Sequence, residues 1–219
     1  MKIQPIESKP VFKPKERDLS DVMPGYKIYE YLLVLNPHEA LREKIIQVKQ
    51  YFFDNYKNST AIYSKPHVTL VNFVQYGMME ERLLNRLEVV AMGCSPIKVE
   101  LKDYGSFPSH TIYINITSKA PIQNLIKNIR ADAQRLMKLN NDNKPHFIME
   151  PHITIVRKLQ PWQYEQGWLE FSNLHFTGRF IADAMLLLRR PLDEPKYQIV
   201  KRFEFKNMPV STVQGVLFG

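Results

Sequence analysis

The sequence predicts an α+β protein built from two similar lobes, and three observations lead to that prediction. Strand-like and helix-like segments alternate along the chain in an order that occurs twice. Each copy carries the pattern Pro-His-apolar-Thr-apolar at the head of a β-branched run, at residues 66–70 and again at 151–155. A chain of 219 residues with 44% hydrophobic residues is also long enough to bury a full core.

The first copy is expected to occupy residues 26–104. Its opening strand ends at Asn36-Pro37, and the proline suits the first turn of a helix. Apolar residues then recur at the spacing of one helix face. The predicted segments are a strand at 26–35, a helix at 38–53, the motif strand at 61–74, a helix at 78–92, a strand at 97–102 and a turn at 105–109.

The second copy repeats this order over residues 111–180. The spacing supports the repeat, because 30 positions separate Pro37 from His67 and 31 separate Pro121 from His152. The predicted segments are a strand at 111–117, a helix at 121–136, the motif strand at 147–156, a helical stretch at 162–170 and a strand at 174–180.

The remaining segments break the symmetry. Residues 184–189 and 197–205 have the composition of two paired closing strands, so we expect one bilobal domain over 26–206 that closes at 184–205. Four prolines among charged residues predict an extended arm at 1–25. Residues 207–219 are predicted to be a tail without regular structure.

Composition and charge narrow the function classes. The sequence contains no run of 18 apolar residues, so no membrane helix is predicted. The first residues lack the apolar core of a secretory signal. The lone Cys94 forms neither an internal disulfide nor a site of several thiolates, which favours a reducing, cytoplasmic compartment. The formal net charge of +8 favours an anionic partner such as RNA or a nucleotide, and no obligate protein partner is expected.

The duplicated motif carries the candidate chemistry. In a strand, residues i and i+2 share a face, so His67 lies beside Thr69 and His152 beside Thr154. Random placement of the 6 histidines and 7 threonines predicts about 0.2 His-x-Thr triplets, whereas the chain has three, and the two that begin at His67 and His152 occur in matching contexts, each directly after a proline. An imidazole transfers protons near neutral pH, and a hydroxyl donates to an oxyanion.

These residues give the chain a resemblance to the two-histidine (2H) phosphoesterase superfamily, in particular to its 2′,5′ RNA ligase and RNA 2′,3′-cyclic phosphodiesterase branch. The stretches HVTLVNF, PHITIVRKL and LLLRRPLDEPKYQIVKRFEF are similar to the motif strands and the closing strands of that family. The resemblance implies a bilobal α+β fold, with two antiparallel sheets lining a central cleft and the helices outside. It also implies chemistry without a metal ion or other cofactor.

The resemblance further implies a role for each motif residue. His152 corresponds to the base that activates the attacking water, and His67 to the acid that protonates the leaving ribose oxygen. Thr69 and Thr154 correspond to hydroxyls that hold the phosphate. Two other interpretations remain open: the histidines are buried strand residues with satisfied hydrogen bonds, or they bind zinc together with a carboxylate such as Glu150.

Further substrate contacts are predicted beside the motifs. Lys65 precedes the first motif, and strict alternation places Phe73 on the face of His67 and Lys158 on the face of His152. Arg157 follows the second motif on the opposite face, so a bulge would be needed to turn it inward. Tyr113 faces the cleft if its strand lies beside the second motif strand, where it could stack on a base.

The sequence therefore predicts an enzyme, a metal-independent phosphodiesterase for RNA processing. It would open 2′,3′-cyclic phosphates of RNA ends or nucleotides, with reversible 2′,5′ RNA ligase activity as a further expected reaction. Its partner would be an RNA or nucleotide with a cyclic phosphate or a 2′,5′ linkage. The alternative is a non-catalytic module that binds RNA or nucleotides in the same cleft.

Overall fold

The computed structural model describes residues 26–208. The predicted arm at 1–25 and residues 209–219 of the predicted tail lie outside the described residues. In chain order the elements are β1 (Ile28–Leu35), α2 (Glu39–Tyr56), α3 (Thr60–Tyr63), β2 (Val68–Tyr76), η2 (Gly77–Met79), α4 (Glu80–Met92), β3 (Ile97–Phe107), β4 (Thr111–Ile116), α5 (Lys119–Met137), β5 (His146–Phe147), β6 (His152–Arg157), α6 (Pro161–Phe171), β7 (Thr177–Ala182), β8 (Ala184–Pro191) and β9 (Gln198–Glu204).

The strands form an antiparallel sheet in the order β7-β3-β4-β6-β2-β1-β8-β9, with β5 attached to β2. This confirms the predicted α+β class with antiparallel strands. The predicted pair of sheets is joined into one, because β2 and β6 pair at Val68 and Ile153. The two motif strands are therefore neighbours at the centre of the sheet.

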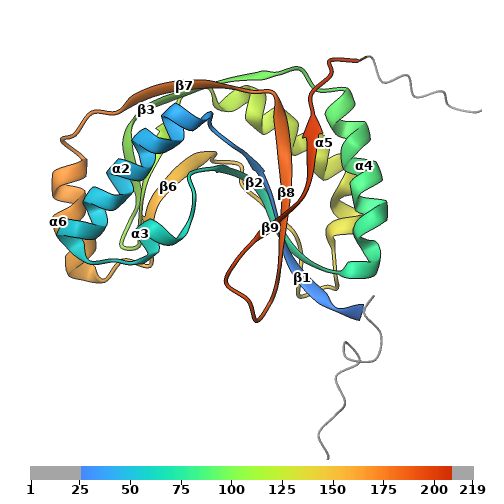
Figure 1. Cartoon of the computed structure of the whole chain (residues 1–219), viewed down its shortest axis with the longest axis horizontal. Coiled ribbons are helices and arrows are strands. Elements are labelled where there is room, and N and C mark those ends of the chain that lie inside the picture. The colour runs from blue at the N-terminus through green and yellow to red at the C-terminus, as the bar shows by residue number, and fades with distance from the viewer. Residues whose placement is uncertain (1–25, 209–219) are drawn as a thin grey trace, which may run out of the picture.

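The helix that leads to each motif strand packs against the other half of the sheet. Helix α2 joins β1 to β2 but packs against β6 and β7, whereas α5 joins β4 to β6 but packs against β2. Figure 1 shows the resulting arch, with α2, α3 and α6 on one arm and α4 and α5 on the other. Because each half is covered by a helix from the other β–helix–β unit, the two halves depend on each other for burial.

Three local predictions differ from the structure. The segment before the first motif is the short helix α3, and β2 begins only after Pro66, which has no N–H for a ladder. The second motif strand likewise begins at His152, after Pro151, and only β5 of the preceding residues is paired.

The predicted turn at 105–109 begins later, at residue 108, because β3 continues to Phe107. Gly105 lies within this strand, and position 105 requires a glycine because the ring of Tyr113 covers its backbone. A Cβ atom on Gly105 would lie 2.6 Å from that ring. The glycine therefore marks a close approach of side chain to backbone within a sheet rather than a turn.

Both motif strands contain a β-bulge at the same position of the motif. In β2, Leu70 is the extra residue between Thr69 and Val71, which pair with consecutive residues of β1. In β6, Ile155 is the extra residue between Thr154 and Val156, which pair with consecutive residues of β4. A bulge reverses the alternation of side chains for every residue that follows it.

Candidate functional site

The motif side chains lie on one face of the sheet, which we call the motif face. His67, Thr69, His152 and Thr154 are each partly exposed there, while the alternating apolar residues beside them are buried. The antiparallel register around Val68 and Ile153 places His67 on the Thr154 side and Thr69 on the His152 side. The two histidines are thus diagonal neighbours, with Cα atoms roughly 7–8 Å apart.

Each imidazole is fixed by a backbone carbonyl two residues earlier. Nδ1 of His67 lies 2.7 Å from the carbonyl oxygen of Lys65, and Nδ1 of His152 lies 2.7 Å from that of Glu150. A carbonyl oxygen only accepts, so Nδ1 carries the proton and donates it in both residues. The neutral tautomer therefore leaves Nε2 of each ring with a free lone pair, in the same orientation in both motifs.

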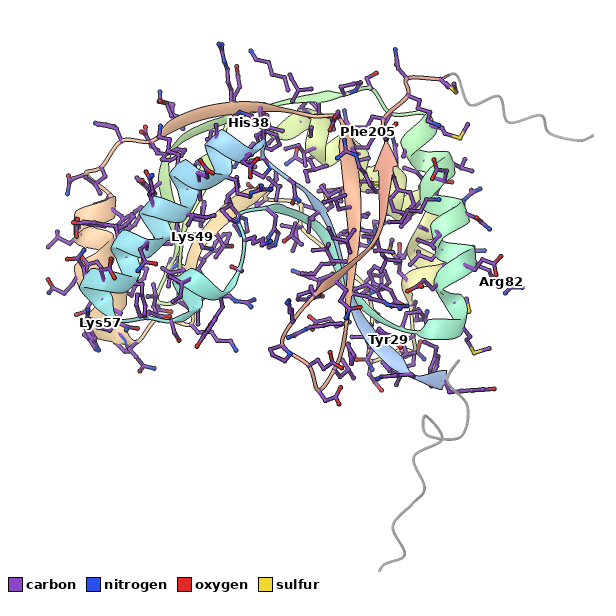
Figure 2. All side chains as sticks on the ribbon, viewed as in Figure 1. Tyr29, His38, Lys49, Lys57, Arg82 and Phe205 are labelled. Carbon is purple, nitrogen blue, oxygen red and sulfur yellow. The ribbon has the colours of Figure 1, made fainter. Side chains whose placement is uncertain are left out.

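A buried lysine joins the two motifs, and sequence reasoning missed it. Lys49 of α2 is 2% exposed (Figure 2), and its Nζ donates to Ser64 Oγ at 3.1 Å and to the carbonyl oxygen of Thr154 at 3.2 Å. Ser64 precedes the first motif and Thr154 belongs to the second. The signal was a lysine on the buried helix face that also carries Leu41 and Ile45.

The charges around His67 and His152 differ. Burial lowers the pKa of His67, and the positive charges of Lys49 and Arg157 lower it further, against the hydrogen bond to Lys65. Burial also lowers the pKa of His152, where the hydrogen bond to Glu150 and the carboxylate of that residue act in the opposite direction and Lys119 lowers it further. Burial beside Arg157 lowers the pKa of Lys49 to about 8.

Arg157 lies on the motif face, against the alternation that placed it on the opposite face. The bulge at Ile155 turns it, and Arg157 pairs with Thr111 on the same face of β4 as Tyr113. Its charge acts on both His67 and Lys49. The structure thus gathers two cationic side chains next to the first motif histidine.

The structure does not support two of the contacts predicted for the motif face. Phe73 follows the bulge at Leu70, is 1% exposed and stacks on Tyr31 with ring centroids 5.1 Å apart. The prediction that Phe73 shares the face of His67 is therefore wrong. Lys158 comes after the end of β6 with φ of 55°, so the alternation that predicted it beside His152 does not reach it. The side chain of Lys65 is exposed, and its contact with His67 is through the backbone.

An aromatic pair lies beside the second motif. The ring centroid of Tyr113 is 4.8 Å from that of His152, and Phe107 is 5.1 Å from His152 and 4.6 Å from Tyr113. The structure brings Tyr113 to the site as the sequence predicted. Phe107 was missed because it fell in the predicted turn at 105–109, although its place opposite Thr111 puts it on the motif face.

Metal ligands do not gather in this region. Among residues 26–208, no three His, Cys, Asp or Glu side chains lie close enough together to hold a metal ion. Within the same residues no helix has the length and apolar character needed to cross a membrane.

Comparison with known proteins identifies the family. The model of the 2′-5′ RNA ligase superfamily matches residues 36–194. The chain belongs to this superfamily. The resemblance to 2H phosphoesterases is thereby confirmed, and membership implies an enzyme with phosphoesterase or RNA ligase-like activity. No curated protein matches the sequence.

Solved structures of other proteins have the same fold. LigT of E. coli complexed with 3′-AMP is 16% identical with a TM-score of 0.60, and the match covers 82% of this chain and 99% of LigT. TT0787 of Thermus thermophilus is 16% identical with a TM-score of 0.57, and the match covers 81% of this chain and 98% of TT0787. LigT has also been solved with NADP⁺ and with ATP.

Proposed function

We propose that the chain is a metal-independent phosphodiesterase that opens 2′,3′-cyclic phosphates of RNA ends or nucleotides with water, and that it has reversible 2′,5′ RNA ligase activity in which an RNA 5′-hydroxyl takes the place of the water. The observation that carries the proposal is the paired presentation of Nε2 by His67 and His152 on one face, each beside a threonine hydroxyl. The diagonal separation of roughly 7–8 Å leaves room for one phosphoryl group between the two rings. The nucleotides bound by LigT agree with a substrate of this class.

The charges support an assignment of acid and base that is the reverse of the one the resemblance implied. His67 lies among cations that favour its neutral form, which is the form that takes a proton from water. Burial and Lys119 also lower the pKa of His152, but the neighbouring Glu150 carboxylate, which His67 lacks, offsets part of this and favours the protonated form that gives a proton to the leaving oxygen. We therefore assign His67 as base and His152 as acid in the hydrolytic direction.

Each step of the proposed reaction then has a group in place. Water deprotonated at Nε2 of His67 attacks phosphorus, the bond from phosphorus to the ribose 3′ oxygen breaks, and Nε2 of His152 protonates that oxygen. The hydroxyls of Thr69 and Thr154 donate to phosphoryl oxygens as negative charge develops on them. Lys49 and Arg157 add positive charge next to the phosphate site. The product is a 2′-phosphate.

Hydrolysis of a 2′,3′-cyclic mononucleotide in EDTA tests the proposal, with His67→Ala and His152→Ala beside the unaltered protein. We expect EDTA-resistant conversion to the 2′-phosphate that both substitutions abolish. Binding of the nucleotide without turnover would instead favour the non-catalytic module. Activity that EDTA removes would contradict the metal-independent mechanism.

A further inference from the structure

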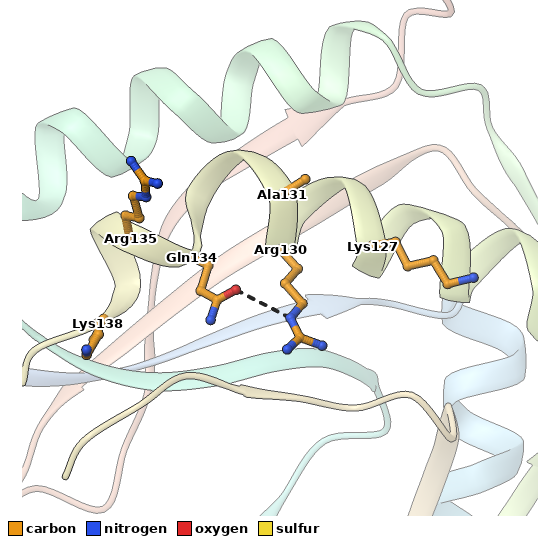
Figure 3. A pocket seen from close by; sticks show the side chains of 6 residues that line it. All are labelled: Lys127, Arg130, Ala131, Gln134, Arg135 and Lys138. Carbon is orange, nitrogen blue, oxygen red and sulfur yellow. Dashed lines mark hydrogen bonds between the residues drawn. The ribbon is translucent and has the colours of Figure 1, made fainter. Parts of the chain in front are cut away.

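A hollow of about 630 Å³ lies along the C-terminal half of α5 (Figure 3). It is lined by Lys127, Arg130, Ala131, Gln134, Arg135 and Lys138. Four of these six side chains are cationic and none is acidic. The residues recur at intervals of three, four or seven, so they form one stripe along the helix surface.

The four cations of this stripe, which we call the α5 basic groove, have no acidic partner among residues 26–208. Arg130 donates to the neutral amide of Gln134, and Lys138 donates to that of Asn141. The nearby carboxylate of Asp132 is already paired with Arg86 at 2.6 Å. The groove therefore keeps its full positive charge.

An aromatic ring lies beside these cations. The guanidinium of Arg130 is 5.7 Å from the ring centroid of Phe147, and Phe147 is only half-buried although it pairs with Val71 of β2. Proteins that bind single-stranded nucleic acids combine a basic track for the backbone with aromatic rings on which bases stack. A phosphate-bearing polymer with bases thus matches the groove better than an anion that lacks bases.

Helix α5 links the groove to the segment that precedes the second motif. Lys119, at the start of the helix, pairs with Glu150 at 2.7 Å, and Gln123 donates to the carbonyl oxygen of Met149 at 2.9 Å. Further along the helix, the guanidinium of Arg130 lies over the ring of Phe147. Helix α5 therefore runs alongside the segment that leads to His152. The groove begins about 12 Å along the helix and extends for about 16 Å, a length that spans several phosphates of a strand.

We propose that the α5 basic groove binds the backbone of a single-stranded RNA whose reactive end lies at the two motifs. This inference rests on the proposed function, and it makes an RNA end rather than a free nucleotide the preferred substrate. Nucleotides several positions away from the reacting phosphate would lie along Lys127, Arg130 and Arg135, with a base against Phe147.

Binding of a fluorescent single-stranded RNA with an ordinary 3′-hydroxyl end tests the groove without any turnover. The variant is Lys127→Gln/Arg130→Gln/Arg135→Gln, measured by anisotropy at several salt concentrations. We expect binding at least tenfold weaker than that of the unaltered protein. The slope of log K against log salt should fall by about 2, since each phosphate contact to a single strand contributes about 0.7.

A matched control removes the same charge elsewhere. Lys102, Arg179 and Lys206 are exposed and have no ion pair within the described residues, and they lie on β3, on β7 and after β9. The triple Gln variant at these positions should keep RNA binding within about twofold. Equal weakening in both triple variants would show that only net charge matters and would overturn the proposal, as would unchanged binding in the groove variant.

Two further measurements separate this inference from its alternatives. The groove variant should hydrolyse a cyclic mononucleotide at the normal rate while its KM for an RNA with a cyclic phosphate end rises at least tenfold. Normal RNA binding together with groove-dependent binding to phosphatidylserine vesicles would assign the groove to a membrane surface and overturn the proposal. Absence of mononucleotide turnover in the unaltered protein would contradict the proposed function. The anisotropy measurement needs no turnover, so it tests RNA binding by the groove independently.

Discussion

The two halves of the motif face share one geometry but differ in the charges around it. In both, the histidine donates Nδ1–H to the carbonyl two residues earlier and a bulge follows the threonine. Yet Lys65 stands where the second motif has Glu150, and Asn72 stands where it has Arg157. The repeated backbone supplies two equivalent imidazoles, and the unequal neighbours place different charges around them.

The helices differ in the same way. Ala133 has the same spacing from Leu125 and Ile129 in α5 as Lys49 has from Leu41 and Ile45 in α2. On the Ala133 side, the carbonyl oxygen of the bulge residue Leu70 accepts a hydrogen bond from the backbone N–H of Ile148. The backbone of the neighbouring segment therefore provides the partner for this carbonyl group. On the Lys49 side the ammonium group bonds to Thr154 instead. The backbone carbonyl group in one motif strand is thus hydrogen-bonded to a peptide N–H, and the one in the other motif strand to a lysine ammonium group.

The largest expected effect comes from replacing each of the two histidines, whose surrounding charges differ. His67→Gln and His152→Gln should each lower kcat by about 10²–10⁴-fold. In the unaltered enzyme the rate should fall in acid as His67 is protonated and in base as His152 is deprotonated. The pH dependence of the residual activity should lose its acid limb in His67→Gln and its alkaline limb in His152→Gln. The opposite loss would restore the assignment with His152 as base.

The next largest effect is expected from replacing the two threonines, whose proposed roles differ less from each other than those of the two histidines. Thr69→Val and Thr154→Val remove a hydroxyl but keep the β-branched shape that suits a strand. We expect kcat to fall by about 10²-fold in each, with a smaller change in KM, since the donated bond strengthens as charge develops. Steady-state kinetics on a cyclic mononucleotide measure this. A change in KM alone would mean that the hydroxyls only bind the ground state.

The fold and the motif pairs followed from the sequence because they depend on local patterns. Alternation and helical spacing found most elements, and the i, i+2 rule placed His67 beside Thr69 and His152 beside Thr154. Neither rule detects a bulge or the end of a strand. Phe73 lies beyond the bulge at Leu70 and is buried, Lys158 lies beyond the end of β6 where alternation no longer applies, and Arg157 reaches the motif face only through the bulge at Ile155.

Other parts of the site depend on contacts that are distant in sequence. Lys49 reaches the motifs only because α2 crosses to the other half of the sheet, and no local pattern encodes that crossing. Phe107 reaches His152 only because β3 continues through Gly105. The roles of the motif residues as acid, base and phosphate donors stay predictions.

Lys49→Met tests the charge that one half has and the other lacks. Removing the cation should raise the pKa of His67, so the acid limb of the rate should move to higher pH, with kcat/KM about tenfold lower at neutral pH. Stability should change little. The lowered pKa of Lys49 implies a cost of about 3 kcal/mol at neutral pH, and loss of its two hydrogen bonds offsets most of it.

Thermal unfolding provides the second measurement for Lys49. A folded pKa of about 8, against an ordinary value near 10.5, means that the unfolded chain binds more protons between these values. The unaltered protein should therefore gain stability from this group as pH rises from 8 to 10.5, and Lys49→Met should lack that gain. Strong destabilisation of Lys49→Met with an unshifted pH profile would mean that the lysine only supports the fold.

The smallest effect is expected from the aromatic pair, which one motif has and the other lacks. Tyr113→Leu keeps an apolar side chain over Gly105 but removes the flat ring beside His152. If the ring stacks on the substrate base, KM for a cyclic mononucleotide should rise by about tenfold, the value of one stacked base, while kcat changes by less than threefold. Tyr31→Leu is the matched control, because Tyr31 stacks on Phe73 in the core and is fully buried. It should lower the melting temperature and leave KM alone, so a rise in KM in both variants would show that the ring of Tyr113 acts through the fold and not through the base.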